Sequence, residues 1–211
     1  MEDKFRTYPL GPLATNAYAV FSPGGDQAVW FDAPAGSFDA MIQLSQTGIE
    51  IAALILTHGH WDHTLDAHRF ARAGIPVYAH RADQVLLEQP EVMAPFAYPD
   101  LPLRPVNADH WLSGGDQLHL VGYQIEIRET PGHCPGNITA WFPVLGLAIV
   151  GDSIFSGSVG RTDLPGGDFD LLAQSIQQQI YTLPPHTVLL PGHGPATSVA
   201  HEQVTNPFVK A

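Results

Sequence analysis

Four side chains that can bind metal ions follow a strand-like run, and they constrain the fold of this chain more than any other feature. The run at 51–56 is short, uncharged and aliphatic, which is typical of a buried strand. His58, His60, Asp62 and His63 follow it within six residues. Imidazole and carboxylate groups are good ligands for zinc-like and iron-like cations. A strand that ends in such a loop places the ligands on a rigid base.

Three more polar residues come at the ends of expected strands later in the chain. His133, Asp152 and His193 each follow a glycine, where the backbone can turn sharply and present the side chain to a cleft. A lone histidine of this kind is more often structural or exposed than a ligand. Seven candidates at repeated strand ends instead predict one metal site, in which a carboxylate can bridge two cations.

The composition limits the classes of protein and partner. The chain has 211 residues, of which 45% are hydrophobic and 14% charged, which is typical of one folded domain with a proper core. A net charge of −12 makes nucleic acid and anionic membrane unexpected partners. We expect no membrane-spanning segment, no signal peptide and a cytoplasmic location, and the single cysteine, Cys134, fits a reducing compartment.

Strand and helix patterns alternate in the first half of the chain, which favours an α/β layering. Strands are expected at 5–21 (interrupted at 9–12), 27–31, 51–56 and 76–79, and helices at 37–46, 62–73 and 81–87. The second half predicts strands at 117–121, 124–128, 139–142, 147–150 and 187–190, and a helix at 168–180. The proline-rich segment 89–110 is either a flap over the site or a simple connector. Two packed sheets with outer helices fit this pattern.

The spacing His58-x-His60-x-Asp62-His63, followed in order by the three later residues, resembles the metallo-β-lactamase superfamily. Asp32, at the end of its expected strand, is similar to an early structural aspartate of that superfamily. The resemblance implies an α/β fold, a four-layer αβ/βα sandwich with the metals at one edge of the two sheets. It also implies a single domain over residues 1–211.

A narrower resemblance is to short glyoxalase II-like hydrolases. The motifs that carry it are Thr57–His63, Thr130–His133, Gly151–Phe155, Gly160–Gly167 and Pro191–Pro195. It implies two divalent metal ions, zinc with iron or manganese as alternatives. One ion would be held by His58, His60 and His133, the other by Asp62, His63 and His193, with Asp152 bridging them.

The implied activity is hydrolysis of S-lactoylglutathione or a related small-molecule acyl thioester by a hydroxide that bridges the two metals. Asp62 would also orient that hydroxide and so act in catalysis. Hydroxide forms at neutral pH because a metal lowers the pKa of bound water to about 7, and two cations can stabilise both attacking and leaving oxygens. The protein is expected to be a monomer or a small homo-oligomer.

Substrate recognition is less constrained. Arg161 falls where the family has a basic residue that contacts glutathione, but an ion pair with Asp163 or Asp168 is equally expected. Only 18 residues follow His193, so we expect no C-terminal helical glyoxalase II domain. The alternatives are a mononuclear iron persulfide dioxygenase, a lactonase or weak β-lactamase of the same fold, and a purely structural metal site. Structural sites usually have four ligands, which disfavours the last.

The remaining chemically reactive side chains have simpler interpretations. Cys134 adjoins His133, but a packed thiol is favoured over a nucleophile because the ligand set is complete without it. Trp61 is equally suited to line the pocket or to pack in the core. The other histidines are expected at the surface or in local hydrogen bonds: His68, His80, His110, His119, His186 and His201.

Overall fold

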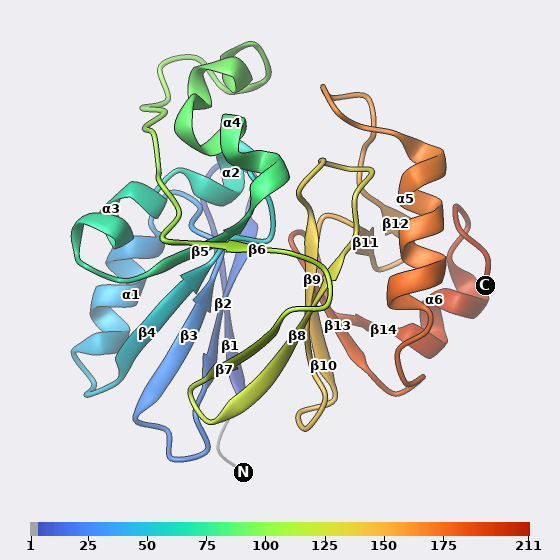
Figure 1. Ribbon diagram of the computed structural model, residues 1–211, viewed down its shortest axis with the longest axis horizontal. Coiled ribbons are helices and arrows are strands. Elements are labelled where there is room, and N and C mark those ends of the chain that lie inside the picture. The colour runs from blue at the N-terminus through green and yellow to red at the C-terminus, as the bar shows by residue number, and fades with distance from the viewer. Residues whose placement is uncertain (1–3) are drawn as a thin grey trace.

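The computed structural model describes residues 4–211, in which two six-stranded sheets pack face to face (Figure 1). The first sheet has the order β1 (Phe5–Leu10), β2 (Thr15–Phe21), β3 (Gln27–Phe31), β4 (Glu50–Ile55), β5 (Val77–His80) and β6 (His110–Leu112). The second has the order β14 (Thr197–Ser198), β13 (Val188–Pro191), β10 (Leu147–Gly151), β9 (Ile138–Phe142), β8 (Tyr123–Glu129) and β7 (Gln117–Leu120). A small hairpin, β11 (Ile154–Phe155) and β12 (Ser158–Val159), follows β10.

Helices cover the outer face of each sheet (Figure 1). The helices are α1 (Ser37–Ser45), α2 (Trp61–Thr64), α3 (Ala67–Arg72), α4 (Gln84–Glu88), α5 (Phe169–Ser175) and α6 (Val199–Thr205). α1 and α3 lie against the first sheet, and α5 and α6 lie against the second. This is the four-layer αβ/βα sandwich that the sequence predicts. No helix within residues 4–211 combines the length and the apolar content that a bilayer crossing requires.

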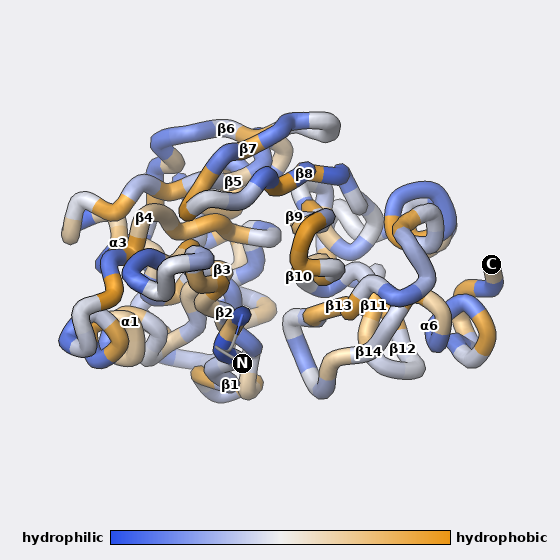
Figure 2. The backbone as a smooth tube through the Cα atoms, turned by 90° about the horizontal axis from the view of Figure 1, so that it is seen from below, coloured by the Kyte–Doolittle hydropathy of each residue, from blue (hydrophilic) through white to orange (hydrophobic). Residues whose placement is uncertain are grey.

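Alternation of side chains along the strands produces three apolar layers. In β3, Trp30 points toward the helical side and packs with Phe70, whereas the next residue, Phe31, points between the sheets. In β10, Ile149 lies between the sheets and Val150 faces α5 and α6. Strands buried on both faces are therefore apolar at successive positions. Hydrophobic residues are concentrated in these strands when the chain is coloured by hydropathy (Figure 2).

The strand directions place every candidate ligand at one edge of the sandwich. β3, β4, β5 and β6 run parallel, so the loop after β4 leaves from the same edge as the end of β3. In the second sheet β10 and β13 are parallel, and β8 has the same direction because β9 is antiparallel to both β8 and β10. The carboxyl ends of β4, β8, β10 and β13 carry the polar turns, and these turns meet there.

The predicted strands are confirmed with ends within two residues, but the predicted helix 62–73 is wrong as a single element. It is divided into α2 and α3, because backbone groups between them bond to the loop after β3 instead of continuing the helix. The Ala33 N–H donates to the His63 carbonyl at 2.7 Å, and the Asp66 N–H donates to the Ala33 carbonyl at 2.8 Å. Asp66 then accepts the N–H groups of Gly36 and Phe38 at the start of α1.

Four other segments differ from the prediction. Segment 89–110 contains a 3-10 turn at Pro90–Phe96, and at its end β6 pairs in parallel with β5. The predicted helix 81–87 begins as a 3-10 turn at Arg81–Asp83, and the helix predicted at 168–180 continues from α5 as a π-helical turn at Ile176–Ile180. α6 is an additional helix that no sequence pattern indicated.

Candidate metal centre

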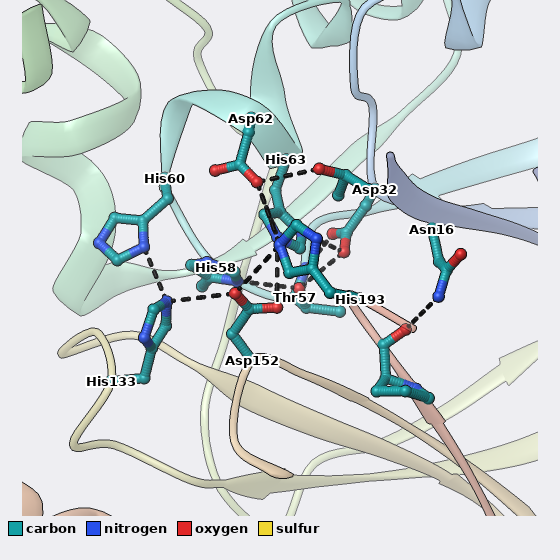
Figure 3. Close-up of polar contacts among 12 residues, drawn as sticks. Asn16, Asp32, Thr57, His58, His60, Asp62, His63, His133, Asp152 and His193 are labelled. Carbon is teal, nitrogen blue, oxygen red and sulfur yellow. Dashed lines mark hydrogen bonds and ion pairs between the residues drawn. The ribbon is translucent and has the colours of Figure 1, made fainter. Parts of the chain in front are cut away.

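The structure brings all seven candidate ligands together at this edge (Figure 3). Ligand atoms of His58, His60 and His133 lie within 4.8 Å of one another, and so do those of Asp62, His63 and His193. Asp152 forms a third such group with His58 and His63, so it lies between the other two. The grouping corresponds to the two ligand sets and the bridging aspartate expected from the resemblance.

Hydrogen bonds to the far ring nitrogens orient the first group. The Nδ1 atom of His58 lies 3.1 Å from the Thr57 hydroxyl, and the Nδ1 atom of His133 lies 2.7 Å from the backbone carbonyl of Arg161. In both rings Nε2 is left for the site. The Nδ1 atom of His60 lies 2.8 Å from the Nε2 atom of His133, so the two rings present nitrogens to the same point. Such second contacts fix ring orientation in metal sites.

Carboxylates surround the second group. The Asp32 carboxylate, which also accepts the N–H and hydroxyl of Thr57, lies 2.7 Å from Nδ1 of His63. Nε2 of His63 therefore points to the site, 3.3 Å from Asp152. The Asp62 carboxylate accepts the hydroxyl of Thr15 at 2.9 Å and lies 3.3 Å from Nε2 of His193.

The buried polar atoms of the site fit a bound cation. Nε2 of His58, His60 and His63 and Oδ1 of Asp152 have no hydrogen-bond partner among residues 4–211, and each of these residues is at most 6% exposed. A buried polar group without a partner costs roughly 1–3 kcal/mol. His58, His63 and Asp152 have ligand atoms within 4.8 Å of one another, so a divalent cation among them would satisfy their unpaired atoms together, whereas His60 presents its Nδ1 atom to the site.

The pKa values of His58 and His60 are shifted in the opposite direction from those of His63 and His193. Burial, reinforced by the neighbouring imidazoles, puts the pKa of His58 well below its usual range and lowers the pKa of His60 to about 3. Burial also acts on His193, but the carboxylates of Asp152 and Asp62 outweigh it and raise its pKa to about 9. The pKa of His63 is raised against the effect of burial by the same carboxylates.

Cation binding to the metal-free protein is therefore expected to release protons at about pH 7. His63 and His193 have raised pKa values and are protonated there, and a ligating imidazole must be neutral. The apparent affinity should rise with pH up to the raised pKa of His193, about 9. Titration calorimetry with zinc in buffers of different ionisation enthalpy measures the number of protons released. Binding without proton release would contradict this assignment.

Asp83 is a residue of this site that the sequence did not reveal. It is 1% exposed, and it joins the two turns that carry the first group. One carboxylate oxygen accepts the Gly59 N–H at 2.7 Å and the other accepts the Gly136 N–H at 2.7 Å. The Cys134 thiol lies 3.1 Å from both oxygens. A single aspartate at the start of a short helix carries no pattern that would distinguish it from a surface residue.

The turn that carries His193 is held from the first sheet. The Asn16 amide donates to the Pro191 carbonyl at 3.0 Å (Figure 3) and to the Gly194 carbonyl at 2.9 Å. The Tyr18 hydroxyl donates to the Pro191 carbonyl at 2.6 Å. A side chain at Gly192 has no space, because its Cβ would lie 2.6 Å from Cε1 of His63 and would also overlap Asp152. The backbone here must approach the ligands closely, which only glycine permits.

The structure distinguishes between several earlier alternatives. The Arg161 guanidinium makes two 2.7 Å hydrogen bonds to Asp163, which is one of the expected ion pairs, and Arg161 also lines the cavity over the site. Cys134 is fully buried, and burial raises the pKa of its thiol, as expected of a packed group. Trp61 is 6% exposed and lines the same cavity. His68 makes a local contact with the Leu65 carbonyl, whereas His80 contacts Glu129, which is 49 residues away in the sequence.

Comparison with known proteins agrees with this geometry. Residues 10–193 match the metallo-beta-lactamase superfamily. A probable metallo-hydrolase of Bacillus subtilis, YqgX, is 37% identical over 98% of this chain and 97% of its own length. The hydroxyacylglutathione hydrolase GloC of Haemophilus influenzae is 32% identical over 84% of this chain and 85% of its own.

Two solved structures are similar over nearly the whole chain. The BLEG-1 B3 metallo-beta-lactamase superposes with a TM-score of 0.90 at 33% identity, covering 98% of this chain and all of that one. TTHA1623 in a di-iron-bound form superposes with a TM-score of 0.85 at 34% identity, covering 97% and 100%. The fold, the convergent histidines and aspartates and the family match lead to one conclusion: this chain belongs to the metallo-beta-lactamase superfamily.

Proposed function

We propose that this metallo-hydrolase binds two divalent metal ions and cleaves acyl thioesters, with S-lactoylglutathione or a related thioester as substrate. The observation that carries the proposal is the pair of ligand groups with Asp152 between them. The name of the Haemophilus influenzae relative, a hydroxyacylglutathione hydrolase, supports the thioester class. Zinc is the proposed metal, and the di-iron form of TTHA1623 makes iron the second choice.

Bound divalent cations supply a nucleophilic water at neutral pH and a Lewis acid for the carbonyl oxygen. The residues of this chain position the reactants and accept the proton that the attacking water loses. Asp62 lines the cavity, and although burial opposes it, the charges of His63 and His193 lower its carboxyl pKa, so it is ionised and can accept a proton from the attacking water. The Thr15 hydroxyl holds that carboxylate in place. A thiolate leaving group needs no protein acid, because thiols ionise at about pH 8.5.

A second candidate activity is β-lactam hydrolysis. It is favoured by the similarity to the BLEG-1 B3 metallo-beta-lactamase, which superposes with a TM-score of 0.90 at 33% identity. The same ligand groups serve either carbonyl substrate, so the ligands do not distinguish the two. The side chains around the ligand cluster, rather than the ligands themselves, decide which substrate fits.

Protein of measured metal content should therefore be tested against a panel of substrates. We expect thioesters to be hydrolysed with a kcat/KM at least about 100-fold above that for β-lactams and lactones, corresponding to roughly 3 kcal/mol of transition-state selectivity. S-lactoylglutathione and neutral acyl thioesters would be followed by thiol release, and a persulfide by oxygen uptake.

His58→Ala, purified in parallel, provides the inactive control for contaminating hydrolases. Absence of thiol release by the metal-loaded protein would reject the proposed function. Oxygen uptake with a persulfide would replace it with an oxidative activity, and a preference for β-lactams would favour the second candidate.

A further inference from the structure

The cavity above the ligand cluster has a polar floor and apolar walls. Its volume is about 340 Å³, and His60, Asp62, His133, Asp152 and His193 reach its floor. The walls are formed by Leu13, Trp61, Met93, Phe96, Phe155, Val159 and Leu164, with Arg161 as the one arginine or lysine among the lining residues. A substrate whose carbonyl lies at the floor must therefore place its other atoms against apolar side chains.

A second hollow of about 300 Å³ extends the cavity outward. It shares Leu13, Trp61, Phe96 and Arg161 with the first and adds Tyr98. We call the continuous surface formed by Leu13, Trp61, Phe96 and Tyr98 the apolar groove. Three of these side chains keep much of their surface in water, with 42% of Leu13, 44% of Phe96 and 51% of Tyr98 exposed. A contiguous group of exposed large apolar side chains beside a reaction site is typical of a ligand contact.

Several contacts fix the positions of the side chains that form the groove. The Trp61 indole N–H donates to the Phe96 carbonyl at 3.2 Å, and the Trp61 and Tyr98 rings meet edge to face at 5.8 Å. Met93 is 2% exposed and anchors the 3-10 turn at Pro90–Phe96, which lies above the sheets in the upper left of Figure 1. Because Trp61 belongs to the ligand-bearing loop, the groove is attached directly to the metal centre.

The charges around the groove disfavour an anionic ligand. Arg161 is the one arginine or lysine that lines either hollow, and its guanidinium is paired with both oxygens of Asp163 at 2.7 Å. Glutathione carries two carboxylates and an ammonium group. The residues that line the two hollows offer neither carboxylate an arginine or lysine side chain that is not already paired.

We propose that the apolar groove binds an uncharged apolar or aromatic group of the substrate, so that the preferred substrates are thioesters with an extended apolar portion. This inference rests on the proposed thioesterase function and, of the substrates proposed there, favours a related apolar acyl thioester over S-lactoylglutathione. The group can belong to the acyl side or to the thiol side of the thioester. The shared chemistry is an alkyl chain or ring that packs against Phe96 and Tyr98.

Two series of neutral thioesters test the proposal. One lengthens the acyl group from acetyl to octanoyl on N-acetylcysteamine, and the other lengthens an S-alkyl thiol on an acetyl group. We expect kcat/KM to rise about two- to fourfold per methylene in one series, since a buried methylene contributes up to about 0.8 kcal/mol. The series that rises identifies the side that enters the groove. Acetyl-glutathione should be poorer than the octanoyl substrate.

Variants then locate the effect in the groove. Phe96→Ala and Tyr98→Ala should each flatten the dependence on chain length, whereas Val92→Ala, on the same 3-10 turn but outside both hollows, should leave it unchanged. Asp163→Asn frees the guanidinium of Arg161 and should shift the preference toward acetyl-glutathione. A flat profile in both series, a rise that survives Phe96→Ala, or a preference for glutathione thioesters would each overturn the proposal.

Binding measurements separate this inference from the proposed function. Non-hydrolysable S-octyl and S-ethyl thioethers of N-acetylcysteamine, titrated calorimetrically, report on the groove even if no thioester is turned over. Tighter binding of the octyl thioether by at least about tenfold, lost in Phe96→Ala, supports the groove independently of catalysis. Equal affinities for the two thioethers would reject it, whatever the hydrolytic activity.

Discussion

Replacement of Asp152 by asparagine is expected to reduce thioester hydrolysis by about 10³-fold or more and to leave at most one tightly bound metal ion per chain. Its carboxylate lies 3.3 Å from Nε2 of His63, 3.4 Å from Nε2 of His193 and 3.6 Å from Nε2 of His133, so it contacts both ligand groups. Metal stabilisation of the transition state contributes several kcal/mol, and about 4 kcal/mol corresponds to 10³-fold.

Metal content and kcat/KM should be measured on the same preparations of the Asp152→Asn variant. Asparagine keeps the size of the side chain and so preserves its close contact with Gly192. Asp66→Asn is a matched control, because Asp66 is also buried but accepts backbone N–H groups of α1 instead of facing the site. We expect it to lower stability by about 1 kcal/mol and to keep both metals and full activity. Wild-type activity in Asp152→Asn would exclude the proposed role.

Replacement of Asp83 by asparagine is expected to weaken metal binding at His58, His60 and His133 by about 10- to 100-fold while the second group keeps its metal. Asp83 accepts N–H groups with both oxygens, from Gly59 beside His58 and His60 and from Gly136 in the turn after His133. Asparagine has only one acceptor oxygen, so its amide would face one of these N–H donors. The variant should also be less stable by roughly 1–3 kcal/mol.

Stoichiometric titration of metal-free Asp83→Asn with cobalt, followed by absorption spectroscopy, resolves the two ligand groups. Cys134→Ala is the matched control, since it removes the thiol contact to Asp83 but leaves both backbone hydrogen bonds. It should bind two metals as the wild type does. If metal affinity falls equally at both ligand groups, Asp83 contributes only to general stability. An unchanged titration would contradict the positioning role.

The sequence predicts the metal ligands better than it predicts the residues that hold the ligand-bearing turns in place, for a physical reason. A ligand at a strand end follows an apolar run and a glycine, so His133, Asp152 and His193 can be recognised from local order. Supporting residues are recognised only by what they contact. Asn16 reaches a turn 175 residues away, and Asp83 joins turns 24 and 53 residues distant, without any pattern of their own.

The errors in secondary structure have a similar origin. Helical periodicity continues through 62–73, but the backbone between α2 and α3 bonds to Ala33, a contact that is local in space and remote in sequence. β6 exists because it pairs with β5 across a loop of irregular structure. For Arg161 a substrate contact and an ion pair with Asp163 or Asp168 were equally expected, and only the folded loop shows that the ion pair forms with Asp163.

The distribution of ligands along the chain has a consequence for synthesis in the cell. The first sheet is complete once Leu112 has left the ribosome, yet its inner face, including Phe31 and Ile55, stays uncovered until the second sheet follows. Four of the seven ligands emerge early, and the last, His193, emerges 130 residues after His63. Since nascent chains fold from the amino terminus, the cluster of seven ligands can be completed only after most of the second sheet has been synthesised.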